Sequence, residues 1–229
     1  MKFPIFRRLV HRAGRPVSPL PMPGQFQRYS HTLPNRYPWI FEFAAQHLDA
    51  AAQLRLLSFG CSRGDEVFAL QRYFPAAAIH GIDIDPRNIA QCTARAVGFR
   101  SARIRFTAAA STVAEADESY DAIFCLAVLC LGDLTASGAR RCEPPLSFGR
   151  FSAVVADFAR CLKPGGLLFL HTTNFRFGDT ATSANFDVVL NAEPAQLASD
   201  VLFDRDNNLM EGVRYSPVCF RKRLPDRAS

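Results

Sequence analysis

The sequence predicts an α/β fold: a doubly wound, mostly parallel, Rossmann-like sheet with helices on both faces and an antiparallel C-terminal hairpin. Short apolar runs alternate with segments of helical periodicity, a pattern typical of parallel strands joined by right-handed crossover helices. One apolar run, Leu54–Phe59, turns through Gly60 and Gly64 into a helix, and the next ends in Asp83. Glycines in such a turn let backbone N–H groups approach a ligand. An acid at the end of the second apolar run, here Asp83, can bind a ribose. These observations predict a nucleoside-binding edge of the sheet.

Element boundaries follow from periodicity and from turn residues. Pro38 suits the first turn of a helix, and Asp85 followed by Pro86 is a helix start signal. The pair Gly165 and Gly166 separates a helix from the strand that follows it. Helices are predicted at 37–48, 65–73, 86–97 and 151–162, strands at 55–59, 78–83, 103–107, 122–126 and 167–172, and a loop at 131–148.

The pattern is weaker after residue 172. Residues 204–208 (DRDNN) are a turn signal, so the chain before and after them is expected to form a hairpin. The segment 180–186 is the candidate for a helix between the fifth and sixth strands. Further strands are expected at 186–190, 201–203 and 215–220.

Length and charge bound the organisation of the chain. The 229 residues suffice for one α/β domain, and no apolar run reaches the roughly 18 residues that span a bilayer. Residues 1–36 hold seven basic groups and no acid, a charge of +7; the rest hold 20 basic and 21 acidic groups, a charge of −1. We therefore expect a basic tail and Pro-rich linker at 1–24 and a single domain at 25–229. Residues 1–15 could touch nucleic acid or an anionic membrane surface, although a flexible tail is the simpler interpretation.

Cysteine usage indicates a reducing compartment. The seven cysteines are odd in number, contain no C-x-x-C pair and lie mostly in apolar runs. Cysteines of this kind usually pack in a core as small hydrophobes. We expect a cytoplasmic protein without a structural metal site.

The spacing of the loop residues discriminates between cofactors. The middle glycine of the dinucleotide pattern G-x-G-x-x-G is absent between Gly60 and Gly64, which argues against NAD and FAD. No lysine of a phosphate loop follows Gly64. The acidic pair Asp65 and Glu66 would repel a phosphate but tolerate an amine and a sulfonium. S-adenosyl-L-methionine is the cofactor that these features favour.

Four segments resemble the class I S-adenosylmethionine-dependent methyltransferases. LLSFGCSRGDE is similar to the first motif of that family, particularly to the form in chemotaxis receptor methyltransferases, and GIDIDPRNIAQC resembles its second motif. SYDAIFCLAVL resembles the fourth strand, and RCLKPGGLLFLHTTN resembles the turn and fifth strand. The resemblance runs from about Leu54 to Asn174. It implies an S-adenosylmethionine-dependent methyltransferase.

The resemblance also implies roles for individual residues. Backbone groups of the first motif would contact the methionine half of the cofactor, an acid would hold the ribose, and apolar groups would flank the adenine and the sulfonium. The family often has an adenine-binding acid after its third strand, where this chain has Ala110, so neighbouring main-chain groups or a hydroxyl would replace it. The implied cofactor-binding residues are Gly60, Cys61, Ser62, Gly64, Asp83, Ile84, Ala110, Ser111 and Cys125.

The methyl acceptor is less readable because methyl transfer needs positioning more than a base. His171 and Asp133 are candidate bases, but a core histidine and a turn aspartate are the simpler interpretations. Phe175, Arg176 and Phe177 could bind a substrate or close the core, so the catalytic residues stay unknown. A small-molecule acceptor is the leading hypothesis. One alternative is that the acceptor is a protein carboxylate. The other is that the chain is a non-catalytic regulatory protein that binds S-adenosylmethionine.

Overall fold

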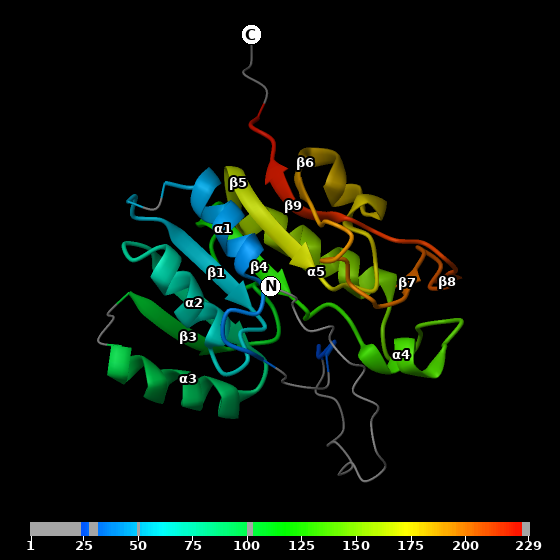
Figure 1. Ribbon diagram of the computed structural model, residues 1–229, viewed down its shortest axis with the longest axis horizontal. Helices are drawn as coiled ribbons and strands as arrows, with labels where there is room; N and C mark the ends of the chain where they lie inside the picture. Colours follow the sequence, from blue (N-terminus) through cyan, green and yellow to red (C-terminus); the bar gives the residue numbers. More distant parts are fainter. Residues whose placement is uncertain (1–23, 28–31, 50, 100–102, 226–229) are drawn as a thin grey trace, which may run out of the picture.

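A computed structural model describes residues 24–27, 32–49, 51–99 and 103–225. Seven strands form one sheet in the order β3-β2-β1-β4-β5-β9-β6 (Figure 1). The first five strands are parallel to one another, while β9 is antiparallel to both of its neighbours. Their bounds are β1 Arg55–Phe59, β2 Ala78–Asp83, β3 Ile104–Ala108, β4 Tyr120–Leu126, β5 Leu162–His171, β6 Phe186–Asn191 and β9 Pro217–Lys222.

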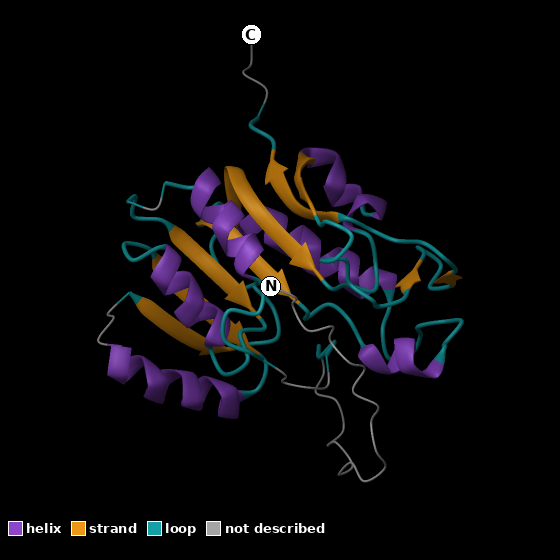
Figure 2. Ribbon diagram, viewed as in Figure 1, coloured by secondary structure: helices purple, strands orange, loops and turns teal. Residues whose placement is uncertain are grey.

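Helices cover both faces of this sheet (Figure 2). One apolar cluster joins the sheet to α1, α2 and α3, and the other joins it to α4 and α5. The helices are α1 Pro38–His47, α2 Asp65–Tyr73, α3 Pro86–Phe99, α4 Gly132–Ser137 and α5 Phe148–Cys161. The predicted doubly wound α/β fold is thus confirmed. No helix in the described part of the chain is long and apolar enough to cross a membrane.

The turn at Gly165 and Gly166 differs from the prediction. The strand β5 starts at Leu162, directly after α5, rather than at Leu167. Tyr120 pairs with Leu162 and Ala122 with Leu167, so the residues between them bulge out of the register. The glycines therefore make a bulge within a strand, because the ladder to β4 continues on both sides of it.

The C-terminal region combines a confirmed hairpin with a wrong helix prediction. The strands β7 (Leu202–Phe203) and β8 (Leu209–Met210) pair antiparallel around the predicted turn. In place of a helix at 180–186 there are two short 3₁₀ segments, η1 (Phe177–Asp179) and η2 (Ala181–Asn185). Phe177, 1% exposed, packs 4.5 Å from the ring of Phe220 on β9, so core packing fixes this connection.

Other predicted boundaries moved by a few residues, and the predicted loop at 131–148 contains the short helix α4. The predicted helix at 65–73 and the strands at 55–59 and 78–83 match the structure. The basic tail lies outside the described residues, as does the predicted linker except for Gly24.

A buried polar network lies beneath the segment that joins β3 to β4. His80, 2% exposed, bonds to the Tyr120 hydroxyl at 2.8 Å and to the Thr107 hydroxyl at 2.9 Å. The Tyr120 hydroxyl donates to Glu115 at 2.5 Å, and Arg105 donates to the same carboxylate at 2.8 Å. Burial lowers the pKa of His80 to about 4, so the ring is neutral at physiological pH.

Candidate cofactor site

The loop between β1 and α2 is held against the end of β2 by backbone bonds. The N–H groups of Gly60 and Cys61 both donate to the Ile82 carbonyl, at 2.7 and 2.9 Å. Gly60 has φ of +73° and Gly64 has φ of +86°, in the left-handed region that favours glycine. The predicted glycines thus form the strand-to-helix turn, and α2 begins directly after Gly64.

Asp83 ties this loop to the start of α3. The carboxylate is 8% exposed, and its Oδ2 accepts a 2.7 Å bond from the Ser62 N–H. Its Oδ1 accepts bonds from the Asp85 N–H at 2.9 Å and from the Asn88 amide at 3.0 Å. A carboxylate offers about four acceptor positions, so roughly one remains for a ligand hydroxyl. Asn88 was not predicted as a site residue from the sequence; it lies in the first turn of α3, which follows β2.

Glu66 lies in the first turn of α2, immediately after the loop. The Ser58 hydroxyl, which is fully buried, donates to its carboxylate at 2.7 Å. Burial raises the pKa of Glu66 to about 7, partly offset by that hydrogen bond. Glu66 also contributes to raising the pKa of the Cys125 thiol, for which burial is the main cause. The two neighbouring acids therefore have different partners: Glu66 accepts from Ser58, whereas Asp65 forms an ion pair with Arg95 at 2.8 Å.

The remaining implied residues lie along the same edge. Ile84 is half-buried and follows β2, and Ala110 and Ser111 are exposed after β3. The Ala109 N–H donates to the Asp83 carbonyl at 2.9 Å, which holds the two strand ends together. The structure thus brings the predicted residues to one carboxyl edge of the sheet.

Two details of the loop were not foreseen. A Cβ built on Gly60 would lie 2.4 Å from Cγ2 of Val128, so the Val128 side chain packs directly on the loop backbone. The Cys61 side chain is 3% exposed and turned inward, and its hydrogen bond with the Cys92 thiol, together with burial, raises its pKa. The Cys61 thiol therefore packs in the core.

Two of the three buried side-chain polar atoms without a hydrogen-bond partner in the described chain belong to this edge. They are the Ser62 Oγ in the loop and the Gln27 Oε1 in the segment Gly24–Gln27. Burying such an atom unpaired costs about 1–3 kcal/mol. Unsatisfied atoms at this position fit a polar ligand.

His171 ends β5 and is 7% exposed. The rings of Tyr37 and Trp39 meet it edge-on, at 5.0 and 5.5 Å between centroids. Burial, followed by the charge of Arg36, lowers the pKa of His171 to about 4, so the ring is neutral. Asp133, the other candidate base, lies in the first turn of α4.

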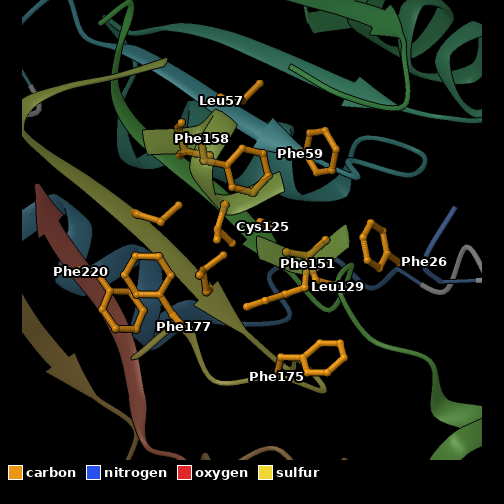
Figure 3. Close-up of a cluster of buried hydrophobic side chains, with 14 of the residues drawn as sticks. Phe26, Leu57, Phe59, Cys125, Leu129, Phe151, Phe158, Phe175, Phe177 and Phe220 are labelled. Atoms are coloured by element: carbon orange, nitrogen blue, oxygen red, sulfur yellow. The ribbon is translucent and has the colours of Figure 1, made fainter. Parts of the chain in front are cut away.

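The aromatic residues after β5 close the core rather than face a substrate. Phe175 and Phe177 are 0% and 1% exposed and belong to the apolar cluster in Figure 3. Arg176 between them pairs with Asp179 at 2.8 Å. The core interpretation of these residues is correct.

A small pocket of about 40 Å³ opens beside His171 at the carboxyl end of β5. Its polar lining includes Asp200, Arg214 and Tyr215. Burial raises the pKa values of Asp200 and Tyr215. The pocket is thus lined by an imidazole, a carboxyl group, a guanidinium and a phenol. No group of histidine, cysteine and acidic residues in the described ranges could hold a metal ion.

The sheet and the glycine loop define a doubly wound α/β domain. Residues 57–170 match the family described as a methyltransferase domain. The chain belongs to the class I S-adenosylmethionine-dependent methyltransferases. No curated protein matches the chain in sequence.

Several solved structures are similar to this chain at low sequence identity. The [4+2]-cyclase SpnF has a TM-score of 0.50 and 16% identity, over 82% of each chain. Geranyl diphosphate C-methyltransferase from Streptomyces coelicolor A3(2) has a TM-score of 0.44 and 17% identity, over 58% of this chain and 44% of that one. Phospholethanolamine N-methyltransferase 2 from Haemonchus contortus has a TM-score of 0.46 and 17% identity, over 62% and 29%. The match therefore spans less than half of either methyltransferase.

Proposed function

We propose that this chain binds S-adenosyl-L-methionine at the carboxyl edge of β1, β2 and β4 and methylates a small-molecule acceptor. The bond from the Ser62 N–H to Asp83 carries the proposal. It joins the glycine loop to the acidic residue, so one edge carries the loop backbone, a carboxylate and the unsatisfied Ser62 hydroxyl. The match to the methyltransferase family supports the assignment.

Each residue has a distinct role in this proposal. Backbone groups of Gly60, Cys61, Ser62 and Gly64 bind the methionine half, and Glu66 pairs with its ammonium. The remaining acceptor position of Asp83 takes a ribose hydroxyl, while Ile84 packs on the adenine beside Ala110 and Ser111. Cys125 lines the wall of the site from β4.

The bound cofactor would supply a methyl group on an activated sulfonium carbon. The chain's own task is then to orient the acceptor and to exclude water. The pocket beside His171 offers hydrogen-bonding groups to a small acceptor. A neutral His171 could accept a proton there. The seven cysteines, an odd number, favour work in the reducing cytoplasm.

The first test is a calorimetric titration with S-adenosylhomocysteine, with NAD as a control. We expect micromolar binding of the former alone. Asp83→Asn keeps the shape of the side chain but weakens its acceptor bonds, so affinity should fall by about 1–3 kcal/mol. Arg72→Ala, on the exposed end of α2, is the matched control. Equal binding of NAD, or an unchanged affinity in Asp83→Asn, would contradict the proposal.

A second test concerns the acceptor. Purified protein is incubated with S-adenosylmethionine and a panel of small amines, acids and phenols, and S-adenosylhomocysteine release is measured. Turnover with a member of the panel supports a small-molecule acceptor. Release only in the presence of a protein extract, sensitive to protease, would favour a protein substrate instead.

A further inference from the structure

The segment Gly24–Gln27, here called the strap, crosses the carboxyl edge of the sheet where the cofactor is proposed to bind. A Cβ built on Gly24, whose φ is +90°, would lie 3.0 Å from the Ala110 Cβ and 4.0 Å from Cδ1 of Ile84. At its other end, the Gln27 amide donates to the Cys130 sulfur at 3.4 Å. Ala110 follows β3 and Cys130 follows β4, and β2 and β1 lie between them in the sheet. The strap therefore spans both strands whose ends carry the cofactor loop and Asp83.

Side-chain packing anchors the strap. Phe26 is 7% exposed and belongs to the apolar cluster that contains Leu129 and Phe151 (Figure 3). The Arg150 guanidinium lies 4.6 Å from the centre of the Phe26 ring and donates to the Gln25 carbonyl at 3.4 Å. A buried aromatic ring with a cation over its face holds a short segment in one place.

The packing of the strap does not explain the position of the Gln27 side-chain oxygen. Its Nε2 is used by Cys130, but its Oε1 is buried and has no partner within the described chain. A buried acceptor without a donor is costly unless a ligand supplies one. The proposed cofactor carries N–H donors at both ends, namely the adenine amine and the methionine ammonium.

The small side chain of Ala110 leaves space for the strap backbone at Gly24. The family often has an acid at this position, and here the small side chain allows Gly24 to lie against it. A larger residue would meet the strap backbone. The loss of the acid and the close approach of the strap are thus parts of one arrangement.

Resting on the proposed function, we propose that the strap Gly24–Gln27 is a wall of the cofactor site and that Gln27 Oε1 accepts a hydrogen bond from a cofactor N–H group. This assigns binding to a segment before the matched family region, which begins at residue 57.

The experiment compares full-length wild type with Gln27→Ala and Phe26→Ala by calorimetry, using S-adenosylhomocysteine and adenosine. Gln53→Ala, an exposed glutamine before β1, is the matched control. We expect Gln27→Ala to weaken S-adenosylhomocysteine binding by roughly three- to tenfold, the effect of one neutral hydrogen bond. Phe26→Ala should act in the same direction by releasing the anchor. Parallel loss of adenosine binding identifies the adenine amine as the donor; unchanged adenosine binding identifies the ammonium.

The two interpretations predict opposite effects of Ala110→Asp on the affinity for S-adenosylhomocysteine. If the strap is a wall, the larger side chain displaces Gly24 and weakens binding. If the site simply lacks an adenine-binding acid, the same substitution strengthens binding. Thermal melting shows that each variant is folded, and Gln27→Glu, which keeps an acceptor oxygen, should recover most of the affinity.

The outcomes separate the two proposals. Wild type that fails to bind S-adenosylhomocysteine overturns the proposed function and the strap proposal with it. Wild-type binding with an unchanged affinity in Gln27→Ala, or a stronger affinity in Ala110→Asp, overturns the strap proposal alone.

Discussion

At the scale of single residues, Glu66 and Asp83 show how two acids at one edge acquire different properties. Asp83 receives three hydrogen bonds from the chain, whereas Glu66 receives one from Ser58. Burial dominates at Glu66 and raises its pKa to about 7. Its charge therefore changes within the physiological range, where a cationic ligand group would respond to it.

We predict that S-adenosylhomocysteine binds more tightly as the pH rises through 7. The ammonium of the ligand pairs with ionised Glu66, and the ionised fraction rises roughly tenfold between pH 6 and pH 8 for a pKa near 7. Glu66→Gln should bind more weakly at pH 8 and lose this dependence. Calorimetric titrations at both pH values check it. A parallel pH dependence in Glu66→Gln would show that another group titrates.

The raised pKa of Glu66 also makes folding stability depend on pH, but stability falls as the pH rises whereas ligand affinity increases. A carboxyl with a raised pKa in the folded state holds its proton there while the unfolded chain has lost it. The contribution to stability is then present below the unfolded value of about 4.5 and is lost as pH rises through 7. Relative to Glu66→Gln, wild type should therefore lose stability across this window, measured by urea unfolding at several pH values.

At the scale of elements, the network around Tyr120 couples three strands and the segment after β3. Tyr120 is 1% exposed at the start of β4, and it contacts His80 of β2 and Glu115. Arg105 of β3 completes the network. Each polar group that is buried here depends on its partners.

Tyr120→Phe should destabilise the fold by about 1–3 kcal/mol, because His80 and Glu115 lose a shared partner in a buried position. Urea unfolding measures the free energy. Tyr73→Phe is the control, since Tyr73 is less buried and its ring packs on Phe41 of α1. Equal effects of the two substitutions would count against the network.

The inserted strand β9 is the second element with a measurable role. It is hydrogen-bonded to β5 on one side and to β6 on the other, and its Phe220 is 2% exposed against Phe177. Phe220→Ala should cost about 3–5 kcal/mol of unfolding free energy. Leu224→Ala, an exposed residue just beyond β9, should have little effect. A small loss for Phe220→Ala would mean that the sheet edge is loosely packed.

At the scale of the whole molecule, all seven cysteines are buried free thiols spread over both faces of the sheet. Their protection therefore depends on the fold as a unit. We expect a thiol reagent to modify the native protein slowly and to titrate seven thiols once urea unfolds it. A cysteine that reacts rapidly in the native state would reveal local opening around it.

The overall fold alone does not specify the chemistry of the site. The cyclase SpnF shares it over 82% of each chain. A common architecture can host different reactions, so activity depends on groups at the site.

Apart from the short helix α4, the order of strands and helices up to residue 172 could be predicted from the sequence, as could the edge where the loop and Asp83 meet. These features are local, because apolar periodicity, a glycine turn and the end of a strand can each be recognised within a short stretch of sequence. The core role of Phe175 and Phe177 stayed open, because the same residues fit a rim or an interior.

Other features of the site depend on contacts between separate elements. The tertiary structure shows that Asp83 already holds Ser62 and Asn88, that Val128 packs on Gly60, and that a segment before the first helix lies against Ala110. Each of these contacts joins residues far apart in the chain or depends on side-chain packing. Sequence periodicity carries information about which face a residue is on, whereas these contacts depend on how separate elements meet in space.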